Sequence, residues 1–332
     1  MRVCIDDDII RGITDDDYGA FKYLMYICSY HNRYTLCIDS NLPTDCEKYL
    51  TQSEIEFFKS ASINAINNLQ YDCTISRKGG EHDEKPIYTL DEGIRFLTQP
   101  VSIVLENNKN DALFIDALIR SYNKRELLGA RKEQWLCYMN AGGCSNICNL
   151  IEAMLAQFDY RRKFLRCYVI LDSDKLAPNH INPKNIKLEQ FLTEQRVPYH
   201  IWEKRMMENY MPDDAMPDGP WKKAYIFLRE EQKDYYNLAH GFERDEKFLP
   251  REDNIYNRDS LLPEQGDFYS DLADENYGIL HKGVEMKQFK EDFPKLFSDV
   301  TKVYYETLQQ RTAHQNNPNE LKETLDEIIK LL

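Results

Sequence analysis

Acidic side chains follow three apolar runs of this sequence, at the points where the runs end. The runs and their acidic residues are 101–105 with Glu106 and Asp111, 164–171 with Asp172 and Asp174, and 198–202 with Glu208. Carboxylates that converge repel one another unless they are protonated or share a cation. Oxygen ligands without Cys or His select a hard ion, so the pattern predicts bound Mg²⁺ or Mn²⁺.

Such ions would direct the chemistry towards phosphate groups. A pair of divalent ions can stabilise both the attacking and the leaving oxygen of a phosphodiester. We therefore predict phosphoryl transfer or phosphodiester hydrolysis. A plainer interpretation stays open, because a single Asp after a strand often caps a helix or forms a turn.

The elements that must position these residues alternate between strands and helices. Short apolar runs typical of buried parallel strands are 101–105, 135–139, 164–171 and 198–202. Between them, 111–122 has apolar residues on one helical face, and Ser145 is a suitable N-cap for a second helix. This order predicts a parallel sheet, and ligands bind at the carboxyl ends of such strands. Glu106 would meet Asp172 and Asp174 there if the first and third strands are neighbours.

The same patterns divide the chain into regions. We expect an N-terminal α/β domain of unknown role at 1–98, the strand–helix alternation at 99–212, and a mostly helical C-terminal region at 213–332. Helices are predicted at 203–210, 221–238 and 320–332. The last of these would pack on the second region or bind a partner.

The composition excludes several classes of protein. With 42% hydrophobic residues in a chain of 332, the protein can bury a sizeable core, which excludes disordered and fibrous proteins. The 42 Lys and Arg against 56 Asp and Glu give a net charge of -14. A nucleic-acid role must therefore rest on local basic patches, bound cations or a partner. The scattered cysteines and the lack of a long apolar segment predict a soluble, cytoplasmic protein.

Several short pieces of this chain occur together in one known domain. They are Val104-Leu105-Glu106 with Asp111, the glycine turn Ala141-Gly142-Gly143, the motif Asp172-Ser173-Asp174, Arg205 followed by Glu208-Asn209-Tyr210, and His281-Lys282-Gly283 downstream. Residues 101–210 on this basis resemble a Toprim domain, the metal-binding fold of topoisomerases, primases and the overcoming-lysogenization-defect (OLD) nucleases. The variants most similar to this chain are the OLD-like nucleases and the Toprim nucleases of bacterial antiphage systems.

The resemblance implies a Toprim-like parallel sheet flanked by helices, and it gives each matching residue a role. The implied roles are metal ligand and general base for Glu106, ligand of a second ion for Asp111, ligands of the main ion for Asp172 and Asp174, a completing ligand for Glu208, and stabilisation of developing charge for Lys282. For Lys282, an ordinary surface lysine is the favoured interpretation, because a Lys-Gly pair occurs often by chance. The implied activity is metal-dependent cleavage of DNA, with RNA as the less favoured substrate, in antiphage defence.

Two positions depart from the pattern of the family. Asn107 stands where Gly is usual, and Asn110 occupies the usual place of the second acidic residue. Asn can bind Mg²⁺ but supplies no charge, so the second ion is the part of the site affected. A non-catalytic Toprim-fold subunit that binds or scaffolds a nucleic-acid complex is therefore the alternative. A primase-like enzyme would need a nucleotide site that no motif supplies.

Other motifs add an expected partner and one weaker alternative. No G-x-x-x-x-G-K-[ST] motif is present, whereas OLD nucleases are typically fused to an ABC-type ATPase. The resemblance thus implies a separate ATPase subunit in a hetero-oligomer, with a homodimer as the other arrangement. Asp6, Asp8 and Asp39 each follow a short apolar run, which is similar to the start of PIN-type nucleases, although turns and helix caps explain them as well.

Overall fold

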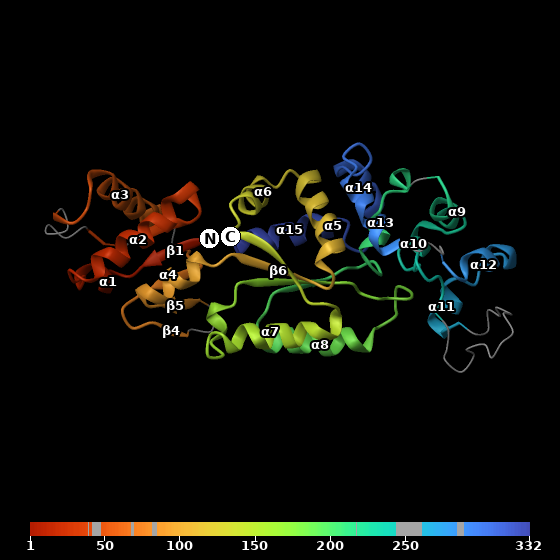
Figure 1. The fold of residues 1–332 in the computed structure, drawn as a ribbon, viewed down its shortest axis with the longest axis horizontal. Helices are drawn as coiled ribbons and strands as arrows, with labels where there is room; N and C mark the ends of the chain where they lie inside the picture. Colours follow the sequence, from red (N-terminus) through yellow and green to blue (C-terminus); the bar gives the residue numbers. More distant parts are fainter. Residues whose placement is uncertain are drawn as a thin grey trace.

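The computed structural model describes residues 1–38, 40–41, 48–67, 70–81, 85–216, 218–243, 261–283 and 289–332. Two sheets and a helical region follow one another along the long axis of the molecule (Figure 1). The N-terminal sheet lies at one end, the second sheet lies in the middle, and most of the short C-terminal helices lie at the other end.

The N-terminal sheet has five strands in the order β2-β1-β3-β5-β4. The strands are β1 (Arg2–Ile5), β2 (Thr35–Ile38), β3 (Cys73–Ile75), β4 (Gly80–Glu81) and β5 (Pro86–Tyr88). Neighbours run parallel except β4, which pairs antiparallel with β5. The helices of this unit are α1 (Asp7–Arg11), α2 (Asp17–Ser29), α3 (Gln52–Asn67) and α4 (Leu90–Thr98). The first region is therefore α/β, as predicted.

The acidic residues after β1 accept hydrogen bonds from within the N-terminal unit. Asp6 caps α1, because its side chain accepts a hydrogen bond from the Asp8 amide at 3.1 Å. The Asp8 carboxylate accepts bonds from the Ser76 hydroxyl at 2.9 Å and from the Arg77 amide at 3.1 Å. Asp6 is therefore a helix cap, as one interpretation expected, whereas Asp8 connects α1 to the segment that follows β3. Asp39 lies outside the described residues.

The second sheet has four parallel strands in the order β7-β6-β8-β9. The strands are β6 (Val101–Leu105), β7 (Leu136–Asn140), β8 (Cys167–Leu171) and β9 (Tyr199–Ile201), and the connecting helices are α5 (Asn108–Ser121), α6 (Arg125–Lys132), α7 (Ile147–Ala156) and α8 (Pro183–Glu194). The prediction of an α/β chain with parallel strands and flanking helices is confirmed. Strands β6 and β8 are direct neighbours, with Val104 opposite Val169, which is the condition that the site prediction required.

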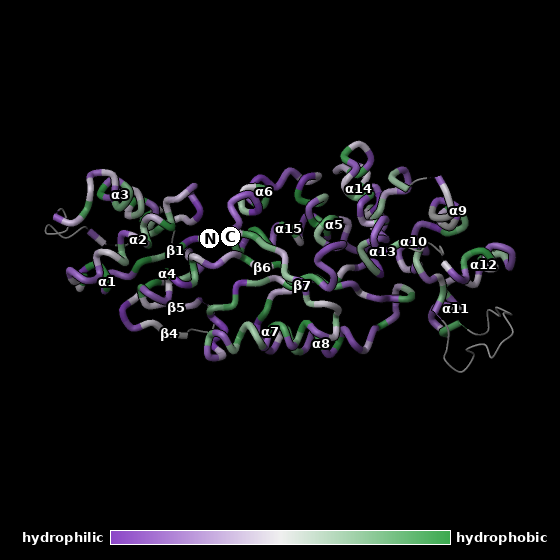
Figure 2. The backbone as a smooth tube through the Cα atoms, in the orientation of Figure 1, coloured by the Kyte–Doolittle hydropathy of each residue, from purple (hydrophilic) through white to green (hydrophobic). Residues whose placement is uncertain are grey.

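Helices cover both faces of this second sheet. Ile103 and Leu105 are buried in one core with residues of α5, α6 and α15 (Glu320–Lys330). Val104 and Val169 are buried in a separate core with residues of α7 and α8. Figure 2 shows hydrophobic segments along the strands in the middle of the molecule, between these helices. The alternation of side chains along each strand therefore supplies both cores.

Two local predictions in this region are wrong. The third strand begins at Cys167 and not at 164, because Phe164 belongs to a 3₁₀ turn and is buried in the core of the N-terminal unit. The helix after the glycine pair begins at Ile147 and not directly after Ser145, because Cys144–Asn146 forms a 3₁₀ turn first.

The C-terminal region is helical and shares a core with one face of the second sheet. Its helices are α9 (Pro220–Ile226), α10 (Glu230–Lys233), α11 (Pro263–Phe268), α12 (Asp274–Leu280), α13 (Phe289–Asp292), α14 (Tyr305–Thr312) and α15. Leu321, Leu325 and Ile328 of α15 are fully buried there, so the expected C-terminal helix packs on the sheet. Among the described residues, no helix combines the length and apolar character needed to cross a bilayer.

Two helices predicted on either side of residue 213 are wrong. The segment 203–210 contains only the 3₁₀ turn Met207–Tyr210, because the backbone of Arg205 pairs with other segments. Its amide donates to the Asp234 carbonyl and its carbonyl accepts from the Asp174 amide, both at 2.9 Å. The expected helix 221–238 is divided into α9 and α10, since the chain turns between Ile226 and Glu230.

Candidate metal centre

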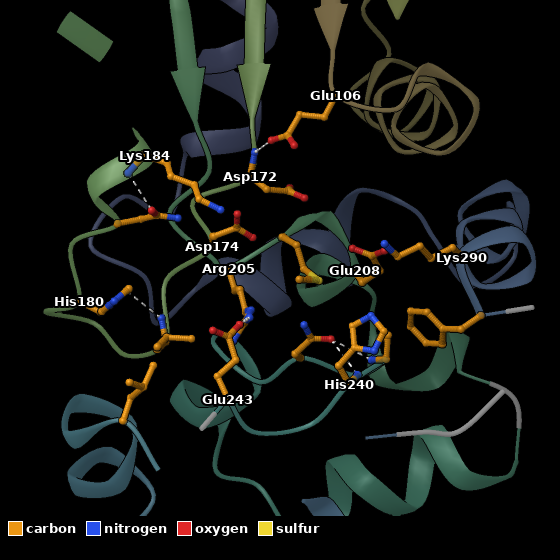
Figure 3. A pocket seen from close by; sticks show the side chains of 17 residues that line it. Glu106, Asp172, Asp174, His180, Lys184, Arg205, Glu208, His240, Glu243 and Lys290 are labelled. Atoms are coloured by element: carbon orange, nitrogen blue, oxygen red, sulfur yellow. Dashed lines mark hydrogen bonds and ion pairs between the residues drawn. The ribbon is translucent and has the colours of Figure 1, made fainter. Parts of the chain in front are cut away.

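The carboxyl ends of β6, β8 and β9 face a cavity of about 470 Å³. Its charged lining residues are Glu106, Asp172, Asp174, Lys184, Arg205, Glu208, Glu243 and Lys290, and His180 and His240 also line it. Figure 3 shows Glu106 and Asp172 at the strand ends, with Asp174 and Glu208 next to them. The parallel strands thus bring together carboxylates from distant parts of the chain.

Glu106 is positioned by the glycine turn that follows β7. Its carbonyl oxygen accepts a hydrogen bond from the Gly143 amide at 3.0 Å. Gly142 and Gly143 have φ angles of 77° and 114°, and residues with a side chain rarely adopt this left-handed backbone conformation. The Glu106 carboxylate then accepts a hydrogen bond from the Asp172 amide at 3.2 Å, which joins the ends of β6 and β8.

The Asp172-Ser173-Asp174 motif forms a tight loop held from two sides. The buried Ser173 hydroxyl donates to the Lys204 carbonyl at 2.7 Å. The Asn185 amide on α8 donates to the carbonyls of Asp172 at 3.1 Å and Ser173 at 2.8 Å. Asp174 has a φ of 51°, a conformation that Asp tolerates better than most residues. These bonds fix the direction of both carboxylates.

Glu208 is presented by a buried turn that the C-terminal region holds. The Asn209 side chain donates to the carbonyls of Lys233 at 2.7 Å and Tyr236 at 2.9 Å. The Tyr210 hydroxyl donates to the carboxylate of Glu320, which is itself almost fully buried at the start of α15. Glu208 therefore lines the cavity, whereas Asn209 and Tyr210 anchor the turn to the C-terminal region.

The other two predicted site residues lie elsewhere. The Asp111 carboxylate accepts a hydrogen bond from the Asn107 amide at 2.9 Å and lines a narrow space beside Asp172, not the main cavity. Lys282 is exposed and does not line the main cavity. The structure thus gathers Glu106, Asp172, Asp174 and Glu208, with Asp111 behind them and Lys282 apart.

Burial and the neighbouring negative charges raise the pKa values of these carboxylates. Burial raises the pKa of Glu106 to about 7, and the charges of Asp174 and Asp111 add to this shift. Burial also raises the pKa of Asp111 to about 7, with a contribution from Glu208. The pKa of Asp172 is raised well above its ordinary value by burial and by the charge of Glu106. Groups with such shifts are typical of functional sites.

The basic residues near these carboxylates act on them electrostatically but form no ion pair with them in the described part of the chain. In the part of the chain that the structure describes, none of Glu106, Asp111, Asp172, Asp174 and Glu208 forms an ion pair with Lys or Arg. The donor set consists of carboxylate oxygens, which fits Mg²⁺ or Mn²⁺. A bound divalent cation would therefore supply the missing compensation.

The carboxylates are near one another but are not arranged around a common point. Among the described residues, no three His, Cys, Asp or Glu side chains approach closely enough to form a ready-made metal site. Asp172 accepts a hydrogen bond from the Met207 amide at 3.1 Å, and Glu106 accepts one from the Asp172 amide. A metal ion at this cavity would therefore require these side chains to change direction.

Among the basic side chains that line this cavity, Arg205 belongs to a motif of the sequence, whereas Lys184 and Lys290 were not predicted. Lys184 comes from the start of α8, Arg205 from the turn after β9, and Lys290 from α13. Figure 3 shows Lys290 directed towards Glu208. Lys290 also opposes the rise in the pKa of Glu208 that burial causes. The one signal in the sequence was the short basic run at 204–205, whereas an isolated lysine on a distant helix has none.

Comparison with known proteins gave no relative. No family model, no curated protein and no solved structure matches this chain. The Toprim resemblance therefore stays a prediction that rests on the residues themselves.

We expect Mn²⁺ to stabilise the folded protein more at about pH 8 than at about pH 5.5. The pKa of Glu106 and that of Asp111 are raised to about 7 in the fold, so stability falls as the pH rises from their ordinary pKa values of 4.5 and 3.8 to about 7, and the loss is complete at pH 8. A bound cation competes with the protons and removes this loss. Thermal unfolding with Mn²⁺ and with EDTA measures the difference, and an equal difference at both pH values would contradict the assignment.

Proposed function

We propose that this protein is a divalent-metal-dependent nuclease with a Toprim-like domain, which hydrolyses phosphodiester bonds in DNA or, as second choice, in RNA. One observation carries the proposal. Glu106, Asp172, Asp174 and Glu208 line a single cavity at the carboxyl edge of a parallel sheet and have no ion-pair partner in the described residues. Buried carboxylates in this state destabilise a fold, so a bound cation and a function are the natural explanation.

The residues of the cavity would have different roles in the reaction. Asp172 and Asp174 would hold the main ion, with Glu106 and Glu208 beside it and Asp111 contributing to a second ion. When bound, Mg²⁺ or Mn²⁺ would neutralise the charge that develops on the phosphate oxygens. Glu106, with a pKa of about 7, is suited to accept a proton from the attacking water near neutral pH.

A lysine would complete the charge stabilisation. Lys282 is the residue that the family resemblance indicates, but it lies outside the cavity lining. Lys290 lines the cavity beside Glu208 and is better placed for this role. A positive side chain there would act on the developing negative charge of the phosphate.

The resemblance also indicates the setting in which the protein acts. We propose an effector subunit of an antiphage defence system, working in the cytoplasm with a separate ATPase subunit. The net charge of -14 supports a partner, because the chain cannot attract nucleic acid by its overall charge.

A non-catalytic Toprim-fold subunit is the second candidate. It is favoured by Asn107 in place of a glycine and by the lack of a ready-made cluster of three ligands among the described side chains. In that case the cavity would bind ions or a partner without hydrolysis.

A cleavage assay separates the two candidates. The protein is incubated with plasmid, linear DNA and tRNA, in the presence of Mg²⁺, Mn²⁺ or EDTA. We expect cleavage with either ion, none with EDTA, and none by Glu106→Ala. Glu126→Ala is the matched control, because Glu126 is exposed on α6 and lies outside the cavity. Equal cleavage by Glu106→Ala and wild type would contradict the proposed site, and an inert wild type, alone and with its ATPase partner, would favour the scaffold.

A further inference from the structure

Arg205 is buried at the floor of the cavity with unused hydrogen-bonding capacity. Its side chain is 2% exposed, although it carries a full positive charge. In the described part of the structure, its Nε and Nη1 atoms have no hydrogen-bond partner, and only Nη2 pairs, with the carboxylate of Glu243. A buried donor without a partner is costly, so its persistence calls for an explanation.

We propose that Arg205 is the phosphate-binding residue of this site and that Glu243 occupies it until a substrate phosphate displaces the carboxylate. The inference rests on the proposed function and deepens it, because it names the group that receives the nucleic-acid backbone and a contact that keeps this group closed.

The position of Arg205 relative to the acidic motif supports this role. The Arg205 carbonyl accepts the hydrogen bond of the Asp174 amide at 2.9 Å, so the arginine is fixed to the loop that carries two predicted metal ligands. Burial raises the pKa of Asp174, the charge of Arg205 opposes this shift, and Glu243 adds to it. Arg205 and Glu243 therefore both lie within electrostatic reach of the acidic motif. Figure 3 shows the two side chains paired below Asp174.

Glu243 is the member of the pair that can leave. Its side chain is 48% exposed, whereas that of Arg205 is 2% exposed. Movement of Glu243 into water would uncover the guanidinium, and because a buried charge without a partner is costly, the phosphate must take the place of the carboxylate as it leaves. A phosphate offers several oxygens where Glu243 satisfies one nitrogen, and a guanidinium binds phosphate through parallel hydrogen bonds. The exchange would satisfy nitrogen atoms that now have no partner.

The charge of the whole cavity fits the same ligand. Five carboxylates and three fixed cations line it, which leaves two negative charges when the histidines are neutral. Departure of Glu243 and arrival of divalent ions would make the cavity positive. Lys184 and Lys290 lie on either side of Arg205 and would then face the same phosphate backbone (Figure 3).

Binding of a fluorescent DNA 20-mer, followed by anisotropy in Ca²⁺, tests the inference independently of cleavage. We expect Arg205→Gln to weaken binding about tenfold, which is the scale of one lost charged hydrogen-bonding contact. Glu243→Gln is expected to tighten binding severalfold, and to have no effect once Arg205 is already replaced. Arg205→Lys should restore part of the affinity. Arg229→Gln and Glu231→Gln are matched controls, because this exposed pair lies outside the cavity.

The outcomes separate this inference from the proposed function. Unchanged DNA binding by both Arg205→Gln and Glu243→Gln overturns the inference, even where metal-dependent cleavage is present. Weaker binding by Glu243→Gln, a surface variant expected to fold, also overturns it, since the pair would then be structural. DNA binding that depends on Arg205 in a protein that cleaves nothing would support the phosphate site and contradict the nuclease. Mn²⁺ should bind Arg205→Gln at least as tightly as wild type, because the positive charge that is removed opposes cation binding at Asp174, and this result would show that the carboxylates are intact.

Discussion

Replacement of Asp172 by asparagine is expected to abolish metal-dependent cleavage, with a loss of about three orders of magnitude or more. Asp172 contacts both neighbouring parts of the site. Its amide donates to the Glu106 carboxylate, and its own carboxylate accepts from the Met207 amide in the turn that carries Glu208. Asparagine keeps the acceptor for the Met207 amide but removes the charge. Single-turnover cleavage rates measure the effect.

The fold should survive this change or become more stable. The pKa of Asp172 is raised because burial and the charge of Glu106 oppose its ionisation, so a neutral side chain removes an unfavourable charge. We therefore expect an unchanged or higher melting temperature and a loss of stabilisation by Mn²⁺. Asp218→Asn serves as the control, because this side chain is 94% exposed. It should keep both metal-dependent cleavage and stabilisation by Mn²⁺. Full cleavage by Asp172→Asn would remove the basis for the proposed site.

Replacement of Arg166 by methionine is expected to lower the free energy of unfolding by about 3 kcal/mol. Arg166 is 3% exposed and joins the two sheets to the C-terminal helix. Its guanidinium donates to the Tyr34 hydroxyl at 2.5 Å, to the Gln99 carbonyl at 3.0 Å and to the Leu331 carbonyl at 2.9 Å. Methionine fills the space but removes the donor to the Tyr34 hydroxyl and to the Leu331 carbonyl, whereas the Gln99 carbonyl keeps its hydrogen bond from Arg33 at 2.8 Å.

Denaturation by urea measures the loss, and Arg162→Met is the matched control. Arg162 is exposed four residues before Arg166, so its replacement should change stability by less than about 0.5 kcal/mol. Arg166 lies at the amino end of β8, and the cavity lies at the carboxyl end. The variant should therefore retain cleavage below its melting temperature. A loss equal to that of the control would show that the three regions hold together without this residue.

Local sequence patterns were sufficient for the strands and for the acidic residues at their ends. The run that becomes β6 is buried throughout and apolar except at Ser102, and Glu106 follows it directly. The run that becomes β8 is likewise buried throughout, and Asp172 follows it directly. These features are short in range, so the sequence carries them plainly. The α/β class and the parallel arrangement follow from them.

Turn chemistry limited the prediction of boundaries and short helices. The segment 203–210 has helical spacing, but the Arg205 amide donates to the Asp234 carbonyl and the Arg205 carbonyl accepts from the Asp174 amide. Phe164 has strand character and yet belongs to the core of the N-terminal unit. In both cases, contacts from distant segments compete with local preference and prevail.

The composition of the site beyond its carboxylates was decided by the tertiary structure alone. Glu243, Lys290 and Glu320 reach the cavity or its supporting turn from the C-terminal region, and none belongs to a local pattern. The sequence determined that acidic groups would stand at strand ends, because strand and turn preferences act over a few residues. Which cations and anchors join them depends on how the helices after residue 213 pack, and that packing is settled only by the burial of the whole core.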